Sequence, residues 1–380
     1  MQKGGRHQLV NNAVAVSASL VDRMAARSSG DLKVIDVFAG AGGLTAGLHR
    51  GSERFRAVRA VEHDLAAAAT YAENFGDVMY AGSVEDWLRD DDVPQVDVVV
   101  GGPPCQGFSL IGKRDPNDER NALWRQFVET VRRAGPRAFV MENVPTFVKS
   151  VEYQALLAEL AQGGLTDYDV RTAVVDAADF GSPQRRKRAV LIGVHRDEKH
   201  PGHLDPVGGD EALTVRDAFR GIRPFVGEFD LRPGMTRFRN TWLPGSFRSS
   251  ELHFTRRWSE KDQARFRSIP YGGSRRDLPR ELSLRCWQDN PRSASDVMGR
   301  LVWERPSVTI RTEFYRPEKG RFVHPTAHRT ITHWEAARLQ GFGDDFRWVG
   351  RRADIARQIG NAVPVHLGEA IGKHLAGALS

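Results

Sequence analysis

The stretch VDVVVGGPPCQGFS, residues 96–109, decides how the fold is interpreted. Residues 97–100 form a short run rich in β-branched side chains, which is typical of a buried strand. The run ends at GGPP (101–104), because glycines allow a tight turn and prolines fix the backbone and remove hydrogen-bond donors. Cys105 therefore follows the carboxyl end of a strand on a stiff loop. Ligands bind at that edge in open α/β sheets.

Cys105 has two interpretations at this point. A cysteine held on a stiff loop at a strand end fits a nucleophile. A small apolar cysteine beside a structural turn fits equally well. The only other cysteine in the chain is Cys286. A catalytic thiol needs companions from elsewhere in the fold, so this stretch alone leaves both interpretations open.

Length and composition limit the class of protein. The 380 residues are enough for two domains, and 40% hydrophobic residues can bury a sizeable core. No apolar run reaches about 18 residues, so we expect no membrane span. Two cysteines supply neither a disulfide framework nor a zinc cluster, so we expect no metal and a reducing, cytoplasmic location. Residues 1–30 lack a secretory signal pattern and are expected to form an N-terminal extension.

The charge is unevenly distributed. The formal net charge is +7, and residues 231–300 hold fifteen Lys and Arg against seven Asp and Glu. This segment therefore carries +8, and the rest of the chain is close to neutral. A basic excess in one segment is typical of a nucleic-acid footprint. A solvated basic surface is the alternative.

Apolar runs alternate with helical stretches in the first half of the chain. We expect strands at 33–38, 56–64, 96–100, 137–144 and 188–194, with helices at 41–49, 65–74, 121–133 and 153–162. This alternation predicts a doubly wound, largely parallel sheet. The pattern breaks after residue 195. Residues 196–325 are rich in Arg, Gly and Pro and predict a second, irregular domain, before helices at 334–339 and 367–379.

Other strand ends carry candidate functional residues. DVFAGAGGLTAG (36–47) places glycines between a strand and a helix, where a ligand can approach the backbone, although the spacing is not GxGxxG. Glu62 ends the second strand and suits the ribose hydroxyls of an adenosine cofactor, or is an ordinary exposed carboxylate. Glu142 ends the fourth strand and can share a crevice with Cys105, or it is a structural cap.

The basic run QRRKR (184–188) immediately precedes the last strand of this region. Alternate residues of an extended segment share a face, so Gln184, Arg186 and Arg188 are predicted to lie together. That face could hold an anionic or carbonyl-bearing substrate. A basic surface turn is the alternative.

These motifs together resemble the DNA (cytosine-5)-methyltransferase family. DVFAGAGGL resembles its cofactor loop, VEHD (61–64) its ribose-binding acid, and GGPPCQGFS its nucleophile loop. ENV (142–144) and QRRKR match the next two motifs in order. RTITHWEAARLQGF (329–342) and QIGNAVPV (358–365) resemble the two closing motifs. The resemblance therefore extends from about residue 34 to the closing helix.

The resemblance implies an α/β, class I S-adenosylmethionine-dependent methyltransferase (Rossmann-like) domain and a smaller, irregular target-recognition domain. It implies that Cys105 attacks carbon 6 of a cytosine that is flipped out of duplex DNA. Glu142 would contact ring nitrogen 3 and the amine, and Arg188, with Arg186 beside it, would support the carbonyl. The cofactor contacts that it implies are Phe38, Gly40, Gly42, Glu62, Leu123, Asn361 and Val363.

The resemblance also divides the chain. We expect catalytic parts at 31–200 and 346–380, which flank a target-recognition domain at 201–345. The closing loop at 108–121 and the basic segment at 230–297 are expected to contact DNA. The expected DNA-binding residues are Gln106, Ser109, Lys113, Arg114, Arg275 and Arg276. One departure concerns the adenine amine, because Ser83 stands where the family usually has an acid. Either Ser83 makes a weaker contact or Asp86 replaces the acid.

Three functions remain to be separated. The first is a DNA cytosine-5 methyltransferase that acts as a monomer on double-stranded DNA in the bacterial cytoplasm, associated with the nucleoid. A cognate restriction endonuclease acting separately is its possible companion. The second is a transfer-RNA methyltransferase of the same family. The third is a non-catalytic DNA-binding regulator, which would not need to keep Cys105, Glu142 and Arg188.

Overall fold

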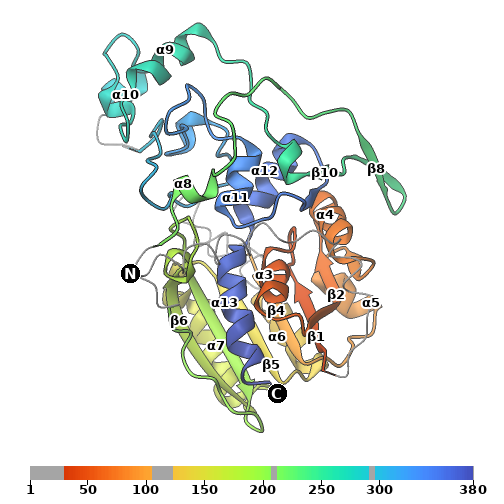
Figure 1. Ribbon diagram of the computed structural model, residues 1–380. Coiled ribbons are helices and arrows are strands. Elements are labelled where there is room, and N and C mark those ends of the chain that lie inside the picture. The colour runs from red at the N-terminus through yellow and green to blue at the C-terminus, as the bar shows by residue number, and fades with distance from the viewer. Residues whose placement is uncertain (1–29, 105–122, 207–211, 291–295, 380) are drawn as a thin grey trace, which may run out of the picture. The chain divides into compact units, whose positions relative to one another are not determined.

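The computed structural model describes residues 30–104, 123–206, 212–290 and 296–379. These residues form two compact units, each with many internal contacts. The sheet unit comprises the described residues of 30–181, 186–206 and 362–379. The second unit comprises 182–185 and the described residues of 212–361. Figure 1 shows the elements of both units.

A seven-stranded sheet forms the centre of the sheet unit. Its order is β3 (Met79–Ala81), β2 (Phe55–Glu62), β1 (Leu32–Val37), β4 (Val98–Gly101), β5 (Ala138–Asn143), β7 (Lys187–His195) and β6 (Tyr168–Asp176). The first five strands are parallel, whereas β7 runs antiparallel to both of its neighbours. The predicted α/β class and largely parallel sheet are thus confirmed. The sequence did not predict β3, which is three residues long, or the half-exposed edge strand β6.

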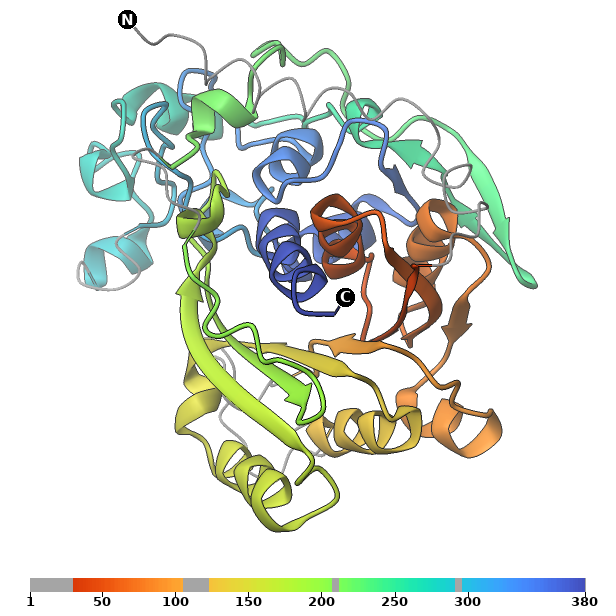
Figure 2. The same cartoon turned by 60° about the horizontal axis from the view of Figure 1, so that its bottom comes forward.

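Helices cover both faces of this sheet. One face packs on α3 (Gly43–Gly51) and α13 (Val365–Ala376), and the other on α5 (Val84–Asp90), α6 (Trp124–Ala134) and α7 (Val151–Gln162). Figure 2 shows α13 beside α3 and the helices of the opposite layer. Successive side chains of a strand point to opposite faces, so Val98 and Val100 enter one core and Val99 the other. Helix α4 (Leu65–Phe75) follows β2.

Glycines allow α13 to approach α3 closely. A Cβ on Gly47 would lie 2.5 Å from the Cα of Gly368, and one on Gly51 would lie 2.5 Å from the carbonyl oxygen of Glu369. Such distances leave no room for a side chain. This contact fixes the last helix of the chain, far away in sequence, onto the first helix of the sheet unit.

The second unit has short elements and long connections, as the sequence predicted. Its helices and strands are α8 (Val215–Ala218), β8 (Met235–Phe238), β9 (Thr241–Pro244), β10 (Phe247–Arg248), α9 (Glu260–Ser268), α10 (Arg285–Asp289), α11 (His333–Leu339), β11 (Arg347–Trp348) and α12 (Arg352–Asn361). Short 3₁₀ turns occur at Ser249–Glu251, Arg275–Asp277 and Pro317–Lys319 here, and at Pro145–Lys149 and Ala177–Phe180 in the sheet unit.

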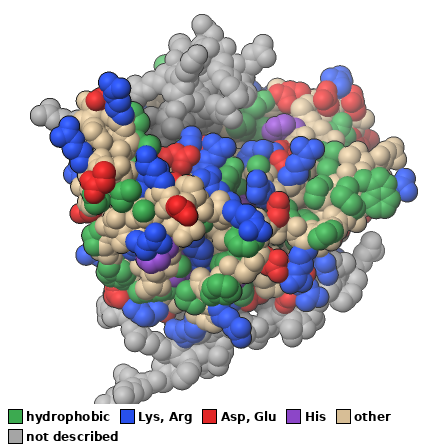
Figure 3. Space-filling view, turned by 90° about the horizontal axis from the view of Figure 1, so that it is seen from above, with side chains coloured by type: hydrophobic (Ala, Val, Ile, Leu, Met, Phe, Trp, Pro, Cys, Tyr) green, Lys and Arg blue, Asp and Glu red, His purple; other side chains and the backbone are tan. Residues whose placement is uncertain are grey.

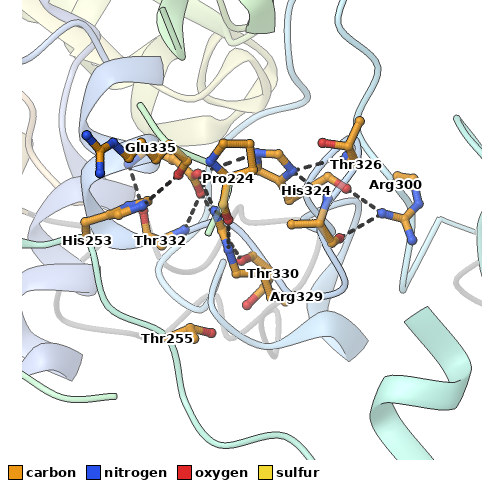
Figure 4. Close-up of polar contacts among 12 residues, drawn as sticks. Pro224, His253, Thr255, Arg300, His324, Thr326, Arg329, Thr330, Thr332 and Glu335 are labelled. Atoms are coloured by element: carbon orange, nitrogen blue, oxygen red, sulfur yellow. Dashed lines mark hydrogen bonds and ion pairs between the residues drawn. The ribbon is translucent and has the colours of Figure 1, made fainter. Parts of the chain in front are cut away.

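A buried ion pair organises the interior of the second unit (Figure 4). Both terminal nitrogens of Arg329 donate to Glu335, each at 2.7 Å, and the Thr332 amide donates to the same carboxylate at 2.7 Å. Burial by itself would raise the pKa of Glu335, but Arg329 outweighs it and lowers that pKa to about 2. Nearby, buried Arg300 donates to backbone carbonyls, including that of His324. Charged side chains thus replace part of an apolar core.

The boundary near the carboxyl end differs from the expected one. Contacts group residues 346–361 with the second unit, and the chain enters the sheet unit again at Ala362. The reason is packing around α12: a Cβ on Gly360 would lie 2.4 Å from the Thr312 amide nitrogen, and the Gln340 side chain donates to the carbonyl of Ile359. The resemblance alone did not reveal these contacts.

The close contact of α3 with α13 is testable by Gly47→Ala. The added methyl group would meet the Gly368 backbone, which has no flexible atom to move, so we expect a loss of roughly 1–3 kcal/mol in the free energy of unfolding. Gly343→Ala is the control, because nothing lies within 4 Å of a Cβ there. Urea unfolding measures both variants. Equal stability of the two would contradict the close packing.

Candidate functional site

The strand register brings four strand ends to one edge of the sheet. Val37, the last residue of β1, pairs with Val61 of β2 and with Gly101 of β4. Gly101 in turn pairs with Met141 of β5. The turns that follow these strands are therefore neighbours. They carry the predicted glycine loop, the residues that lead to Cys105, and the predicted acids.

Gly101 allows this edge to form. A Cβ at this position would lie 2.4 Å from the carbonyl oxygen of Val37, so any larger residue would push β1 and β4 apart. Its successor Gly102 faces the next strand, where a Cβ would lie 3.2 Å from Oε2 of Glu142. The glycine pair thus places the following turn directly against the Glu142 carboxylate.

Glu142 forms an ion pair with Arg188. The Arg188 Nε atom lies 2.6 Å from Glu142 Oε1, and the two side chains are only 13% and 11% exposed. The antiparallel pairing of Asn143 with Ala189 brings the start of β7 to the end of β5. A short, mostly buried charge-assisted contact fixes the direction of both groups. The structure therefore brings together two predicted site residues that are far apart in sequence.

Asn143 connects this pair to the proline turn. Its amide nitrogen donates to the carbonyl oxygen of Pro103 at 3.1 Å, and its own carbonyl oxygen accepts from the Val144 amide at 2.8 Å. The turn is thus anchored at Pro103, two residues before Cys105. Cys105 itself lies outside the described residues, as do the predicted DNA contacts Gln106, Ser109, Lys113 and Arg114.

Arg186 and Arg188 show the predicted alternation. Arg186 is buried and Arg188 is half-buried, whereas Arg185, which precedes them, and Lys187, which lies between them, are exposed. Burial lowers the pKa of the Arg186 guanidinium, the nearby Arg188 cation lowers it further, and Glu142 opposes both effects. The Arg186 backbone is held by its amide, which donates to Asp176 at 2.8 Å. Two guanidiniums and one carboxylate therefore form one charged cluster.

Gln184, the first residue of the QRRKR run, has a structural role. It belongs to the second unit, where its amide nitrogen donates to Gln340 at 2.8 Å and its oxygen accepts from the Ile310 amide at 2.7 Å. Only the later part of the predicted shared face thus contributes to the charged cluster.

Glu62 organises the turn after β1. One of its carboxylate oxygens accepts from the Gly40 amide at 2.9 Å and the other from the Asp64 amide at 2.7 Å. The side chain is 7% exposed. A carboxylate oxygen has two acceptor sites, and Glu62 Oε1 also lies 3.1 Å from His63 Nδ1, so the capacity for a further hydrogen bond to a hydroxyl group is at Oε2. It is therefore not an ordinary exposed carboxylate.

The glycines of this turn serve different purposes. Phe38, Gly40 and Gly42 all have positive φ, at 57°, 55° and 88°. Nothing lies within 4 Å of a Cβ on Gly40, so a ligand can approach the backbone there. A Cβ on Gly42 would instead lie 2.3 Å from the Phe75 ring. Packing against α4 is therefore the physical reason for a glycine at position 42.

A buried polar group below this turn was missed by the sequence analysis. Thr45 donates to Asp36 Oδ2 at 2.6 Å, and its hydroxyl lies 3.0 Å from that of Tyr71. The pKa of Asp36 is raised to about 7. Burial is the main cause, the Thr45 hydrogen bond opposes it, and the nearby Glu62 adds to it. The signal was an aspartate inside the apolar run KVIDVF, since buried polar groups need partners.

The remaining predicted contacts lie in both units. Leu123 precedes α6, Val363 packs against the sheet-unit core, and exposed Asn361 ends α12 of the second unit. In the second unit Arg276 is exposed, but Arg275 is only 5% exposed, and its guanidinium stacks on Trp287 at 5.7 Å. Arg275 therefore supports its own segment.

Ser83 and Asp86 bind each other at the start of α5. The Ser83 hydroxyl donates to Asp86 Oδ2 at 2.8 Å and accepts from the Asp86 amide at 3.0 Å, which caps the helix. Arg89 also donates to the Asp86 carboxylate at 2.6 Å. Hydrogen bonds from Ser83 and Arg89 lower the pKa of Asp86. Both candidates for the adenine contact thus belong to one network.

Within the described ranges, no group of three or more His, Cys, Asp or Glu side chains is arranged to hold a metal ion. In the same part of the chain, no helix is long and apolar enough to cross a membrane.

Comparisons with known proteins agree on one family. Residues 32–377 match the family described as C-5 cytosine-specific DNA methylase. The type II methyltransferase M1.HphI of Haemophilus parahaemolyticus is 32% identical, covering 90% of this chain and 85% of that protein. M.DdeI of Desulfomicrobium norvegicum is 30% identical, with coverage of 90% and 88%.

Solved structures share the fold. A prophage-encoded E. coli protein described as a DNA modification methyltransferase is 26% identical with a TM-score of 0.69, covering 92% of this chain and 99% of that chain. The S. pombe Dnmt2 methyltransferase has a TM-score of 0.54 at 16% identity, covering 90% and 98%, which shows the fold alone.

Asp36→Asn tests the buried carboxyl. The folded chain keeps its Asp36 proton up to about pH 7, whereas the unfolded chain ionises near the ordinary pKa of 3.8, so the native protein should lose stability as the pH rises between these values. The asparagine variant has no such loss. Relative to the native protein, we expect the free energy of unfolding of the variant to increase by about 2–4 kcal/mol between pH 4 and pH 8.

Urea unfolding across this pH range is the measurement. Asp86→Asn, at a half-exposed carboxylate on α5, is the control. Above pH 5 its free energy of unfolding should change with pH as that of the native protein does. An Asp36→Asn protein whose stability follows the native pH dependence would show that Asp36 is ionised in the folded chain.

Proposed function

Since the chain belongs to the C-5 cytosine-specific DNA methylase family, we propose that it methylates carbon 5 of a flipped-out cytosine within a specific sequence of duplex DNA. The observation that carries this proposal is the Glu142–Arg188 pair, which lies against the turn that leads into Cys105. A nucleophile on that turn and a carboxylate beneath it can act on one ring. Such a ring must leave the duplex to expose both faces.

Cys105 begins the proposed reaction. Its thiolate adds to carbon 6 of the cytosine, which forms the sulfur–carbon bond and makes carbon 5 nucleophilic. Carbon 5 then takes the methyl group. A base removes the proton from carbon 5, and the sulfur–carbon bond breaks to release Cys105 and 5-methylcytosine. The thiol is thus recovered in each cycle.

Glu142 and the two arginines assist this addition. A protonated Glu142 would donate to ring nitrogen 3 while its other oxygen accepts from the exocyclic amine, which draws electrons from carbon 6. Arg188 would hold the carbonyl oxygen of the base. Because Arg188 already fixes the direction of Glu142, these two contacts would be oriented before the base arrives. Arg186 adds positive charge behind them.

The sheet edge also fits S-adenosylmethionine, the methyl donor that the family implies. Open space beside Gly40 and the unfilled acceptor site at Oε2 of Glu62 suit an adenosine ribose. Phe38, Gly42, Leu123, Asn361 and Val363 complete the proposed contacts, with the Ser83–Asp86 pair near the adenine. When bound, this group supplies a methyl on a sulfonium, which leaves without needing a general acid.

The second unit would read the target sequence, with exposed Arg276 among its contacts. Gln106 would contact the duplex, and the loop with Ser109, Lys113 and Arg114 would close over it. The family description names DNA, which favours this substrate over transfer RNA or a non-catalytic role. The type II relatives support a restriction–modification context, in which a separate endonuclease recognises the same site.

Cys105→Ala tests the nucleophile. Without a thiolate no adduct can form, so methyl transfer should fall below detection, while DNA binding should persist because phosphate contacts hold the duplex. The measurements are transfer of labelled methyl to DNA and formation of a denaturation-resistant adduct with 5-fluorocytosine duplex. The control is Cys286→Ser, at an exposed thiol in α10, which should retain activity. Robust turnover by Cys105→Ala would overturn the mechanism.

Asn361→Ala tests whether the last motif lines the cofactor site. Loss of one or two hydrogen bonds should weaken S-adenosylmethionine binding by ~1–3 kcal/mol in calorimetric titration. Gln95→Ala is the matched control, because this exposed amide precedes β4 at the opposite edge of the sheet. Unchanged affinity in folded Asn361→Ala would place the motif elsewhere.

A further inference from the structure

An exposed apolar face lies on the two-stranded ribbon of β8 and β9. Trp242 is 63% exposed and Met235 is 56% exposed. In the ribbon Arg237 pairs with Trp242 and Met235 pairs with Pro244, so Met235, Arg237 and Trp242 point to the same side. The opposite side is half-buried at Thr236, Phe238 and Leu243. Trp242 and Met235 are therefore on the side that faces solvent.

The base of the ribbon is fixed, so this face has a defined direction. The Gly350 amide donates to the Pro244 carbonyl at 2.7 Å, and a Cβ on Gly245 would lie 3.1 Å from the carbonyl oxygen of Trp348. Beyond Gly245, Phe247 pairs with fully buried Trp348. A two-stranded ribbon is marginal by itself, and this attachment to a packed aromatic cluster holds it. In Figure 1 the ribbon extends away from its attachment.

The charge around this face selects the partner. Residues 231–250 contain four arginines and no Asp or Glu. Arg232, Arg237 and Arg239 are exposed, and the first two flank Met235 in sequence. Figure 3 shows hydrophobic side chains next to basic ones at the right edge, the side on which β8 lies in Figure 1. A second copy of this segment would bring like charges together, whereas a polyanion would be attracted.

We propose that the ribbon enters the major groove of the bound DNA, with Met235, Arg237 and Trp242 facing the bases. This inference rests on the proposed DNA substrate and names the residues that contact it. The major groove is ~12 Å wide and admits a two-stranded ribbon. Trp242 and Met235 then make apolar contact with base edges, including thymine methyl groups, while Arg237 donates to a guanine edge or phosphate. The ribbon thereby determines part of the sequence that is methylated.

The apolar and charged contacts have different salt dependences. Arg237→Ala removes a cation, so the log–log slope of affinity against salt should become shallower by about one. Trp242→Ala removes apolar area and no charge. We therefore expect a tenfold or greater loss of affinity with an unchanged slope. Phe225→Ala is the matched control, because Phe225 is 82% exposed in the same unit but lies outside the ribbon.

The experiment uses the full chain and a library of duplexes with random sequence. Methylation by the native protein, read by cytosine-methylation sequencing, defines the target and tests the proposed function separately. Anisotropy titration of each variant on that target, at several salt concentrations, gives affinity and slope, and sequencing gives specificity. We expect Trp242→Ala to relax base preference at one or more positions and Phe225→Ala to match the native protein.

Two results would overturn the role of the ribbon while leaving the methyltransferase function intact. In the first, the native protein methylates a defined site, and the Trp242→Ala and Arg237→Ala variants bind and select that site equally well. The other is a Trp242→Ala variant that keeps its DNA affinity but changes sedimentation behaviour, because the face would then bind a second copy of the chain.

Discussion

The charged cluster depends on the reversed direction of β7. In a sheet of parallel strands, the segment that precedes a strand lies at the edge opposite to the segment that follows its neighbour. Because β7 runs antiparallel to β5, the start of β7 meets the end of β5. Arg188, the second residue of β7, therefore reaches Glu142 near the end of β5, and Arg186, which precedes β7, lies close enough to feel its charge. A parallel β7 would separate these charges by the length of the strand.

The same edge holds carboxyl groups with different environments. Asp36 is fully surrounded by protein and retains its proton near neutral pH. Glu62 ends the adjacent strand and accepts hydrogen bonds from two backbone amides. Glu142 is held by a guanidinium. Position on the sheet edge thus does not decide how a carboxyl group is held, whereas its immediate donors do.

The sequence predicted much of this arrangement because its signals are local. The strand ends, the glycine turn and the shared face of Arg186 and Arg188 follow from short stretches of chain. The direction of β7 does not, since an apolar run has the same composition in either direction. Buried roles for Arg275 and Gln184 were also missed, because Trp287 and Gln340, which hold them, come from other segments. Side-chain partners distant in sequence leave no local pattern.

The second unit uses arginine in two opposed ways. Arg300 and Arg329 are buried, and their guanidiniums donate to carbonyl and carboxylate oxygens that hold the unit together. Arg237 and Arg239 are exposed on the ribbon, within a stretch of sequence, 231–250, that contains no Asp or Glu. A count of basic residues therefore overstates the charge available to DNA, because the buried guanidiniums are already committed. The basic excess of 231–300 acts partly as internal structure, through buried Arg265, Arg275 and Arg300, and its exposed part extends from the ribbon through the rest of the segment.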